Sequence, residues 1–384
     1  MLDNALLVLA AVTMAGCILV FLDMAIGNLS IPALDLEDPA SAPYPRVSIV
    51  TAARNEEKHI REALFSILHL DYPDYEVIAV NDRSEDRTGA ILDSMRADFP
   101  QLQVIHVQTL PDGWLGKNHA LFSGANAARG ELLLFSDADV KFARTALTRA
   151  VGYMQRNSID HVTVAPRLAP GTIPLSLAVQ FFFMAFTVYM RPWKARDPRS
   201  KRYMGIGAFN LMRRTAYERA GTIQRIALRP DDDIMLAKIL KHSGASQHLL
   251  NGQDMLSVTW YSTLREMVAG LQKNAFAGLR YSLILAIGAV IGTFLFNVWP
   301  FMALFLTSGL TRTLNIAVCI LLMTMYAGGA FRMQGRTWLA IAYPVAAAIF
   351  MYILVTATAR TLFHRGIAWR GTRYSLDDLK ANKV

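Results

Sequence analysis

Uncharged apolar runs lie near both ends of this chain and flank a middle region, Arg46 to about Thr263, of ordinary charge density. The first run, Ala5 to Leu22, is about long enough to cross the hydrocarbon core of a bilayer as a helix. Because 53% of the residues are hydrophobic and only 18% are charged, the chain is too apolar for an ordinary soluble protein. The pattern predicts a membrane protein with a water-soluble middle domain.

The first run has two interpretations, a cleaved signal peptide and a retained anchor. No Lys or Arg precedes the run, it is longer than the apolar core of most signal peptides, and no clear small-residue cleavage site follows it before Asp23. We therefore expect a transmembrane anchor over residues 1–24 and a linker over residues 25–45.

The C-terminal region, residues 282–359, is expected to be embedded in the membrane. It holds three further apolar blocks: Ser282–Leu306, Leu314–Phe331 and Trp338–Ala359. Asn297 and Pro300 interrupt the first block, which is either one kinked span or a tight hairpin of two short helices.

The tail, residues 360–384, is rich in basic residues: Arg360, Arg365, Arg370, Arg373, Lys380 and Lys383. Because positive charge near helix ends favours the cytoplasmic side, we expect the tail inside and the N-terminus outside. If the middle domain is also cytoplasmic, an even number of crossings separates it from the tail. This favours the hairpin near Pro300.

The net charge of +9 limits the classes of partner. No stretch interleaves basic and aromatic residues as nucleic-acid-binding modules do, so no nucleic acid is expected, and an anionic lipid membrane and phosphates are better partners. Cys17 and Cys319 both lie in apolar runs, which excludes a disulfide framework and a cysteine-based metal site.

Short aliphatic segments alternate with helical patterns in the middle region. The predicted strands are Val47–Thr51, Glu76–Val80, Gln103–Val107 and Leu132–Phe135, and the first predicted helix is Glu56–Leu70. This alternation predicts an α/β fold, Rossmann-like with a mainly parallel sheet. Ligands bind such sheets beyond the carboxyl ends of the strands, so the residues that follow each strand are the candidates for a site.

Charged side chains follow three of the predicted strands. Arg54 and Glu56 follow the first strand, Asp82 follows the second, and Asp137 and Asp139 follow the fourth. Clustered carboxylates repel one another unless a cation is present, and carboxylate oxygens suit Mg²⁺ or Mn²⁺. Most isolated Asp-x-Asp triplets are solvated turns, but this triplet directly follows a strand. Asp82 either caps the next helix or accepts the imide N–H of a uracil base.

Two helix starts carry further charged candidates. Lys117 lies in a glycine-flanked turn before a helix, where its charge and the free backbone N–H groups suit a phosphate; a solvated lysine is the alternative. The run Asp231–Asp233 opens a predicted helix over Ile234–His242. These acids either cap the helix or supply a general base whose pKa is raised by the neighbouring carboxylates.

The middle region resembles family 2 glycosyltransferases of the GT-A fold, which are inverting enzymes that use nucleotide-diphosphate sugars. Five motifs carry the likeness in the expected order: VSIVTAARNEE, VNDRSEDRT, GWLGKNHAL, FSDAD and RPDDDIMLAK. The resemblance implies a role for each candidate: Arg54, Glu56 and Asp82 around the nucleoside, Lys117 near the phosphates, Asp137 at both donor and metal, Asp139 at the metal, and Asp233 as catalytic base with Asp232 as its companion. The Gln-x-x-Arg-Trp motif of the family's processive polymer synthases does not occur in this sequence, which argues against a polymer-threading synthase.

The layout of an anchor, a GT-A domain over residues 46–263 and C-terminal spans is similar to that of lipid glycosyltransferases. Among these are ceramide glucosyltransferase and bacterial enzymes associated with hopanoid or carotenoid glycosylation. Within the domain, residues 176–203 combine an apolar run with a basic cluster, typical of a helix at the membrane interface; a buried core helix is the alternative. Residues 264–281 are expected to form an amphipathic helix at the interface. The likeness implies a bacterial inner membrane, with the domain and the tail in the cytoplasm.

The resemblance therefore implies a metal-dependent inverting glycosyltransferase. It would move a sugar of glucose type from a UDP-sugar to a hydroxyl of a membrane lipid such as a ceramide, a hopanoid or a diacylglycerol. A polyprenyl phosphate is the alternative acceptor, and its ionised oxygen would need no base. A non-catalytic scaffold or a transporter with a nucleotide-sensing domain is the alternative from another class. The sequence carries no signal for a particular oligomeric state.

Overall fold

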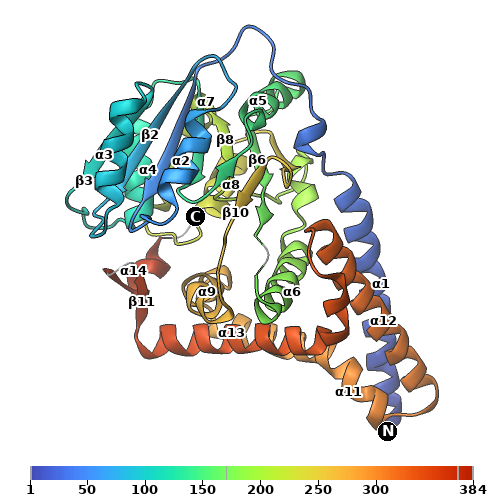
Figure 1. Ribbon diagram of the computed structural model, residues 1–384. Helices are drawn as coiled ribbons and strands as arrows, with labels where there is room; N and C mark the ends of the chain where they lie inside the picture. Colours follow the sequence, from blue (N-terminus) through green and yellow to red (C-terminus); the bar gives the residue numbers. More distant parts are fainter. Residues whose placement is uncertain (1, 170, 370–371, 383–384) are drawn as a thin grey trace. The chain divides into compact units, whose positions relative to one another are not determined.

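The computed structural model describes residues 2–169, 171–369 and 372–382 (Figure 1). The chain divides into two compact units. The sheet unit comprises residues 30–169, 192–260 and 381–384, and the helical unit comprises residues 1–29, 170–191 and 261–380. Two basic residues of the predicted tail, Arg370 and Lys383, lie outside the described residues.

A seven-stranded sheet forms the centre of the sheet unit, in the order β3-β2-β1-β4-β8-β6-β9. Its strands are β1 (Val47–Ala53), β2 (Tyr75–Asp82), β3 (Leu102–Val107), β4 (Leu132–Asp137), β6 (His161–Ala165), β8 (Asn210–Arg213) and β9 (Gln247–Asn251). Strand β8 is antiparallel to β4 and β6, and the other pairings of this sheet are parallel. The predicted mainly parallel α/β fold is confirmed.

Helices pack on both faces of this sheet (Figure 1). One face packs against α2 (Ile60–Leu68), α3 (Thr88–Asp98) and α5 (Ala146–Asn157), and the other packs against α4 (Gly116–Ala127), α7 (Arg214–Arg219) and α8 (Asp232–His242). Because both faces are covered, the central strands are continuous aliphatic runs and do not alternate with polar residues.

Helix α2 begins at Ile60, later than the predicted start at Glu56. Asn55 has a φ of 56°, in the left-handed region, which turns the chain before the helix begins. The N–H of Glu56 donates to Thr88 Oγ1 at 2.8 Å, which holds this turn against the start of α3. Asp86 accepts from the N–H of Thr88 at 2.9 Å and thereby caps α3.

A second, smaller sheet has the order β5-β10-β7. Its strands are β5 (Lys141–Phe142), β7 (Arg167–Leu168) and β10 (Leu256–Val258), and the short helices of the unit are η1 (Leu34–Leu36), η2 (Pro192–Arg196) and η3 (Ile223–Ile226). Strands of two or three residues are too short to show a sequence period, which explains why they were not predicted.

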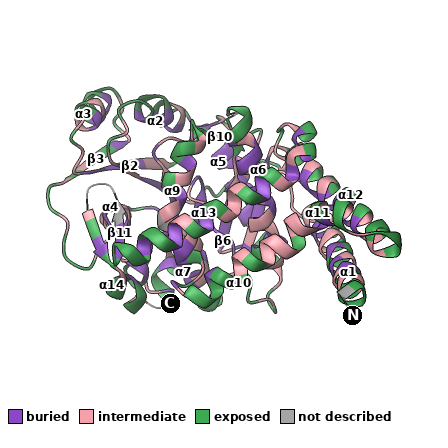
Figure 2. Ribbon diagram, turned by 90° about the horizontal axis from the view of Figure 1, so that it is seen from below, coloured by how far each residue is buried: buried purple, intermediate pink, exposed green. Residues whose placement is uncertain are grey.

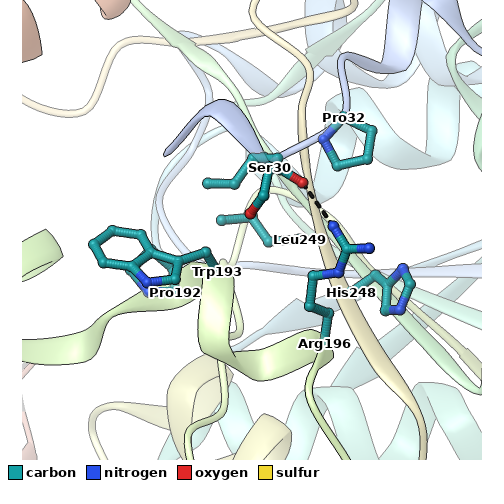
Figure 3. Close-up of a pocket in the computed structure, with 8 residues that line it drawn as sticks. Ser30, Pro32, Pro192, Trp193, Arg196, His248 and Leu249 are labelled. Carbon is teal, nitrogen blue, oxygen red and sulfur yellow. Dashed lines mark hydrogen bonds between the residues drawn. The ribbon is translucent and has the colours of Figure 1, made fainter. Parts of the chain in front are cut away.

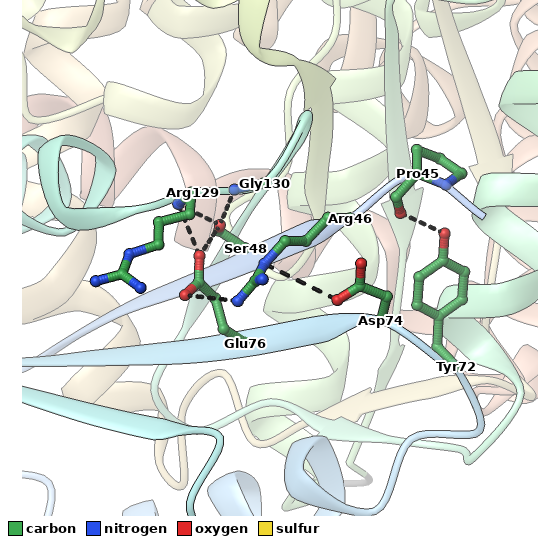
Figure 4. A network of polar contacts seen from close by, with 8 residues as sticks. All are labelled: Pro45, Arg46, Ser48, Tyr72, Asp74, Glu76, Arg129 and Gly130. Carbon is green, nitrogen blue, oxygen red and sulfur yellow. Dashed lines mark hydrogen bonds and ion pairs between the residues drawn. The ribbon is translucent and has the colours of Figure 1, made fainter. Parts of the chain in front are cut away.

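Polar contacts close the amino end of the large sheet (Figure 4). Ser48 Oγ donates to Glu76 Oε1 at 2.6 Å and accepts from the N–H of Gly130 at 2.7 Å. The N–H of Arg129 also donates to Glu76 Oε1, at 2.7 Å, and Arg46 pairs with the same carboxylate at 3.4 Å. These contacts tie the starts of β1, β2 and β4 together, and the carboxyl ends of the strands remain for ligands.

The helical unit consists mainly of long apolar helices. They are α1 (Leu2–Leu29), α6 (Ile173–Met190), α9 (Leu264–Gly278), α10 (Leu283–Thr293), η4 (Phe294–Val298), α11 (Trp299–Leu306), α12 (Gly309–Arg332), η5 (Thr337–Ala342) and α13 (Tyr343–Phe363), followed by a hairpin of β11 (Gly366–Trp369) and β12 (Thr372–Ser375) and by α14 (Leu376–Ala381). The predicted amphipathic helix over residues 264–281 corresponds to α9.

Five segments of the described chain are long and apolar enough to cross a membrane. They are Asp3–Leu29, Ile173–Arg196, Leu283–Leu306, Gly309–Arg332 and Thr337–Phe363. Many of their apolar side chains are exposed, as the green residues along α1 and α12 show in Figure 2, and Ile284 and Phe305 are 82% and 84% exposed. An apolar surface of this extent is unfavourable in water and indicates association with a membrane.

The block that contains Asn297 and Pro300 is a kinked helix, so the predicted hairpin is wrong. Helix α10 continues through the π-helical turn η4 into α11, and Pro300 lies in the first turn of α11. At this place the missing N–H of proline is accommodated by the π turn, and the helix bends without ending. Asn297 Oδ1 accepts a hydrogen bond from the Tyr343 hydroxyl at 2.6 Å, which ties the bend to α13.

Helix α1 runs to Leu29, past the predicted boundary of the anchor at residue 24. Asp23 does not end the helix because Arg191 neutralises it. The Nε and Nη2 atoms of Arg191 each lie 2.7 Å from an oxygen of Asp23. The predicted linker is correspondingly shorter.

Helix α6 belongs to the helical unit, whereas the sequence predicts residues 176–203 within the GT-A domain. The hydroxyl of Tyr326 in α12 donates to the carbonyl of Leu177 at 3.0 Å, and the rings of Phe181 and Tyr343 lie 5.4 Å apart. The helix starts at Ile173 and is long enough to be one of the five candidate spans. Its position at the membrane interface stays a prediction.

Candidate active site

The strand ends that carry the predicted site residues lie at one edge of the large sheet. Strands β1, β2 and β4 are parallel neighbours, and their register pairs Ala53 with Asn81 and Ala52 with Asp137. Arg54, Asp82 and Asp137 therefore leave the sheet at the same edge, which is opposite to the polar contacts of Figure 4.

Lys117 connects two of the acidic groups. Its Nζ atom lies 2.8 Å from Asp137 Oδ1 and 3.0 Å from Asp232 Oδ2. Burial alone would lower the pKa of Lys117, but the charges of Asp137, Asp232 and Asp233 outweigh burial and raise the pKa, so the ammonium group stays charged. The structure thus brings together predicted residues from β4, α4 and α8.

Asp139 is a buried acid close to two other acids. Burial, followed by the charges of Asp137 and Glu56, raises the pKa of Asp139 to about 7. The described residues contain no group of three His, Cys, Asp or Glu side chains arranged to hold a metal ion. Asp137 and Asp139 supply two neighbouring carboxylates, and proteins commonly hold Mg²⁺ with one or two carboxylates together with phosphate oxygens.

Asp233 is held by two backbone N–H groups. Its Oδ2 atom accepts from Gly207 and its Oδ1 atom accepts from Ile234, each at 2.8 Å. Burial, followed by the charge of Asp232, raises the pKa of Asp233 to about 7. A fixed carboxylate with a pKa near neutrality has the properties of a general base.

Asp231, the first acid of the same run, has a different partner. Arg229 donates to both of its oxygens, from Nε at 2.9 Å and from Nη2 at 2.7 Å. Asn118 in α4 donates to the carbonyls of Ile226, Ala227 and Arg229 at 2.8, 3.1 and 3.0 Å and fixes the segment that leads to this pair. Asp231 is therefore a structural acid, and the two acids that follow it are available for chemistry.

Asp82 is buried and is held by Arg83. The Nε and Nη2 atoms of Arg83 lie 2.7 Å from Oδ1 and 3.2 Å from Oδ2, and Arg54 Nη1 lies 4.0 Å from Oδ2. Gly116 approaches so closely that a Cβ atom there would collide with Asp82 Oδ2. Asp82 does not cap α3, since Asp86 does. A carboxylate has about four acceptor positions, so Asp82 keeps capacity for a further donor.

Sequence reasoning missed several contributors to this edge of the sheet: Arg83, Gly116, Asn118 and Gly207. The first three lie inside motifs that carry the family resemblance, but their roles depend on contacts between distant segments. A Cβ atom at Gly207 would collide with Asp137 Oδ2, and no sequence pattern marks that approach.

A separate small hollow in the sheet unit contains none of the predicted site residues (Figure 3). It is lined by Ser30, Ile31, Pro32, Pro192, Trp193, Arg196, His248 and Leu249. Arg196 Nη1 donates to the carbonyl of Ser30 at 2.9 Å across it. The hollow has room for about one water molecule and is too small for a nucleotide.

The sheet order and the Asp-x-Asp triplet after β4 define a fold of the GT-A type, as comparison with solved structures confirms. The chain is similar to the mannosyltransferase PcManGT from Pyrobaculum calidifontis, whose structure contains GDP-Man and Mn²⁺. The TM-score is 0.58 at 19% identity, and the match covers 95% of this chain and 100% of that one. At this identity the likeness establishes the fold alone.

The family model "Glycosyl transferase family 21" matches residues 8–381. The chain therefore belongs to glycosyl transferase family 21. The expected glycosyltransferase of the GT-A type is confirmed, and its family number is 21, whereas the motifs suggested family 2.

Curated relatives match over part of the chain. The β-monoglucosyldiacylglycerol synthase of Synechocystis is 33% identical over 162 residues, which is 42% of this chain and 33% of the relative. The 4,4′-diaponeurosporenoate glycosyltransferase of Staphylococcus aureus is 37% identical over 109 residues, or 28% of each chain. The matched part is thus a third or less of each relative's length. The expected resemblance to lipid glycosyltransferases is confirmed.

Proposed function

We propose that this protein is an inverting glycosyltransferase that moves a sugar from a UDP-sugar to a hydroxyl group of a membrane lipid. The observation that carries the proposal is the meeting of Lys117, Asp137 and Asp232 at one edge of the sheet, with Asp233 next in the chain. Membership of family 21 supports the reaction class. Relatives named for glucosyldiacylglycerol and diaponeurosporenoate support a donor of glucose type and a lipid acceptor.

The nucleotide of the donor would bind at Arg54, Glu56 and Asp82, and its diphosphate would bind near Lys117. The buried carboxylate of Asp82 would accept the N3–H of uracil, with Arg83 holding its orientation. The ammonium group of Lys117 lies between two acids and stays charged, so it could neutralise part of the negative charge of a diphosphate.

Asp137 and Asp139 fit a divalent cation. Burial, with the charges of Asp137 and Glu56, raises the pKa of Asp139, so a bound cation would stabilise its ionised form, and oxygen ligands are those that Mg²⁺ and Mn²⁺ prefer. When bound, Mg²⁺ or Mn²⁺ would stabilise the charge that develops on the departing diphosphate.

Asp233 would act as the general base. The acceptor oxygen forms a bond to the anomeric carbon on the face opposite the diphosphate, the bond from that carbon to the diphosphate oxygen breaks, and the hydroxyl proton passes to Asp233. The carbon inverts, and UDP leaves with the electron pair. The pKa of Asp233, raised to about 7, suits a base at neutral pH. Asp232, its companion, helps to raise that pKa and pairs with Lys117.

The five candidate spans support an integral membrane protein with access to a lipid acceptor in the bilayer. Exposed basic residues in the last turn of α13 and after it, namely Arg360, Arg365 and Arg373, support contact with the anionic cytoplasmic surface of a bacterial inner membrane. The sheet unit would lie on that cytoplasmic side, where UDP-sugars are made. Because residues 283–306 form one kinked helix, this arrangement requires that one of the three apolar segments after the sheet unit lies along the membrane and does not cross it.

The proposal is tested by incubating membranes that contain the protein with a series of radiolabelled UDP-sugars and extracting the lipids. We expect label from one UDP-sugar in a neutral glycolipid, and none with Asp233→Asn membranes. Label found only in a polyprenyl-phosphate sugar would show that the acceptor is a polyprenyl phosphate and not a lipid hydroxyl. No label in lipid from any UDP-sugar would contradict the proposal.

A further inference from the structure

One short segment joins the proposed metal ligand to the proposed base. In the segment Met204–Ala208, the carbonyl of Gly207 accepts from the N–H of Asp137 at 2.9 Å, and the N–H of Gly207 donates to Asp233 Oδ2 at 2.8 Å. A Cβ atom at Gly205 would collide with the backbone carbonyl of Asp233. The distance between the two acids therefore depends on where this segment lies.

Side chains from β6 and β9 hold the segment in place. Gln247 Oε1 accepts from the N–H of Met204 at 2.7 Å, and Thr163 Oγ1 accepts from the N–H of Ile206 at 2.9 Å. Thr163 Oγ1 also donates to the carbonyl of Phe209 at 2.9 Å. The backbone groups of the segment are thus fixed by side chains of the sheet.

His161, which is fully buried, holds Gln247 in turn. Gln247 Nε2 donates to His161 Nδ1 at 2.8 Å and to the carbonyl of Ala237 at 3.1 Å, so both of its hydrogens are used. Because Nδ1 must accept, the proton of the neutral ring is on Nε2, which donates to Asn210 Oδ1 at 3.1 Å. Burial lowers the pKa of His161 to about 4, which keeps the ring neutral near pH 7, and its two hydrogen bonds then select this tautomer.

We propose that His161, with Gln247 and Thr163, is a positioning residue for glycosyl transfer: it fixes the segment Met204–Ala208 and, through it, the separation of Asp233 from Asp137. The inference rests on the proposed function. None of the three side chains needs to touch a substrate. A shift of about 1 Å in a group that positions reacting atoms can reduce a rate by about a hundredfold. The segment bonds directly to the side chain of Asp233 and only to the backbone N–H of Asp137, so we expect a larger effect on kcat than on donor binding.

The test compares variants of the full-length protein in lipid vesicles. His161→Phe keeps a ring of similar size and removes both hydrogen bonds, and His161→Gln restores one acceptor and one donor. Thr163→Val is a second, nearly isosteric variant in case His161→Phe does not fold. Tyr153→Phe is the matched control, because the Tyr153 hydroxyl bonds at 2.6 Å to His248, which lies in β9 beside Gln247, and within the described chain it makes no hydrogen bond to residues 204–208.

We expect His161→Phe to lower kcat about tenfold to a hundredfold while the KM for the UDP-sugar stays within about twofold. Thr163→Val should act in the same direction, His161→Gln should recover most of kcat, and Tyr153→Phe should match the wild type. Amide hydrogen exchange of residues 204–208 should quicken in His161→Phe and not in Tyr153→Phe.

The inference is overturned if exchange in residues 204–208 is unchanged, or if kcat falls no more in His161→Phe and Thr163→Val than in Tyr153→Phe. Equal changes in KM and kcat without recovery in His161→Gln would mark a role in stability only and would also overturn it. A wild-type protein that transfers no sugar contradicts the proposed function instead, and the exchange measurement then still decides whether the network holds the segment.

Discussion

Replacing Asp233 by Asn removes the proposed base with little change of shape. Asp233 accepts one backbone hydrogen bond on each oxygen, from Gly207 and from Ile234. Asn has one oxygen, so its NH₂ group must face one of these N–H donors. The variant therefore loses the proton acceptor and also one of the two hydrogen bonds that orient the side chain.

The two losses have different magnitudes. An N–H group left without its acceptor costs about 1–3 kcal/mol of stability, which a folded protein can tolerate. Loss of a general base costs about 10² to 10⁴ in rate, or about 3–5 kcal/mol of barrier. Donor affinity should change little because the proposed nucleotide contacts are at Asp82 and Lys117. The expected result is turnover at least about a hundredfold slower with near-normal binding of UDP.

The assay measures kcat for lipid glycosylation and, by calorimetry, the Kd for UDP in the same preparations. Asp231→Asn is the matched control, because Asp231 pairs with Arg229 and lies outside the proposed chemistry. It should remain within a few fold of the wild type. Near-normal turnover by Asp233→Asn together with an inactive Asp232→Asn would show that the base was assigned to the wrong acid, and activity in both variants would favour a phosphate acceptor.

Four further outcomes are expected. Chelation by EDTA, or Asp139→Ala, should abolish transfer while leaving the protein folded and membrane-bound; full activity in either case would remove the metal assignment. UDP should inhibit far better than CDP, whose N3 is itself an acceptor, because mispairing at Asp82 costs about 1–3 kcal/mol; equal inhibition would count against Asp82. Gly207→Ala should lower kcat at least about tenfold, since its Cβ would collide with Asp137, and an unchanged kcat would show that the segment can move freely. Finally, burial lowers the pKa of His161 from 6.5 to about 4, so the unfolded chain takes up this proton first as the pH falls. The contribution of His161 to the free energy of unfolding, about 3 kcal/mol, should be lost between these two pH values, and urea titrations should show a smaller fall with pH in His161→Gln than in the wild type.

The central strands and the acids that follow them could be predicted from the sequence, because both are local signals. A buried parallel strand is largely an aliphatic run, as in β1, β2 and β4, and the edge strand β3 alternates buried and exposed residues. Asp82 and Asp137 end such strands, so their common edge follows from the rule for parallel sheets. Asp139 and Lys117 were found in the same way, from their place relative to a strand or helix.

Contacts between distant segments could not be predicted. Nothing in the sequence around Lys117 shows that its ammonium reaches Asp232, which is far along the chain. The continuation of α10 through Pro300 depends on a π turn and on a hydrogen bond from Tyr343 in another helix. Likewise, α1 continues beyond Asp23, whose charge is neutralised by Arg191 at the end of α6. In the two helices, a contact from a distant residue allows the helix to continue where the local sequence predicted its end. In the case of Lys117, the partner lies too far along the chain to be recognised.

The proposed transfer from a UDP-sugar to a lipid hydroxyl is tested most directly by the stoichiometry of the reaction. The purified protein, in vesicles that contain a lipid with a free hydroxyl, is incubated with labelled UDP-glucose, and UDP and glycolipid are both measured. The account predicts one UDP released for each glycolipid formed, a product with inverted configuration at the anomeric carbon, and loss of both products in Asp233→Asn. Release of UDP without labelled lipid, or a product of retained configuration, would contradict it.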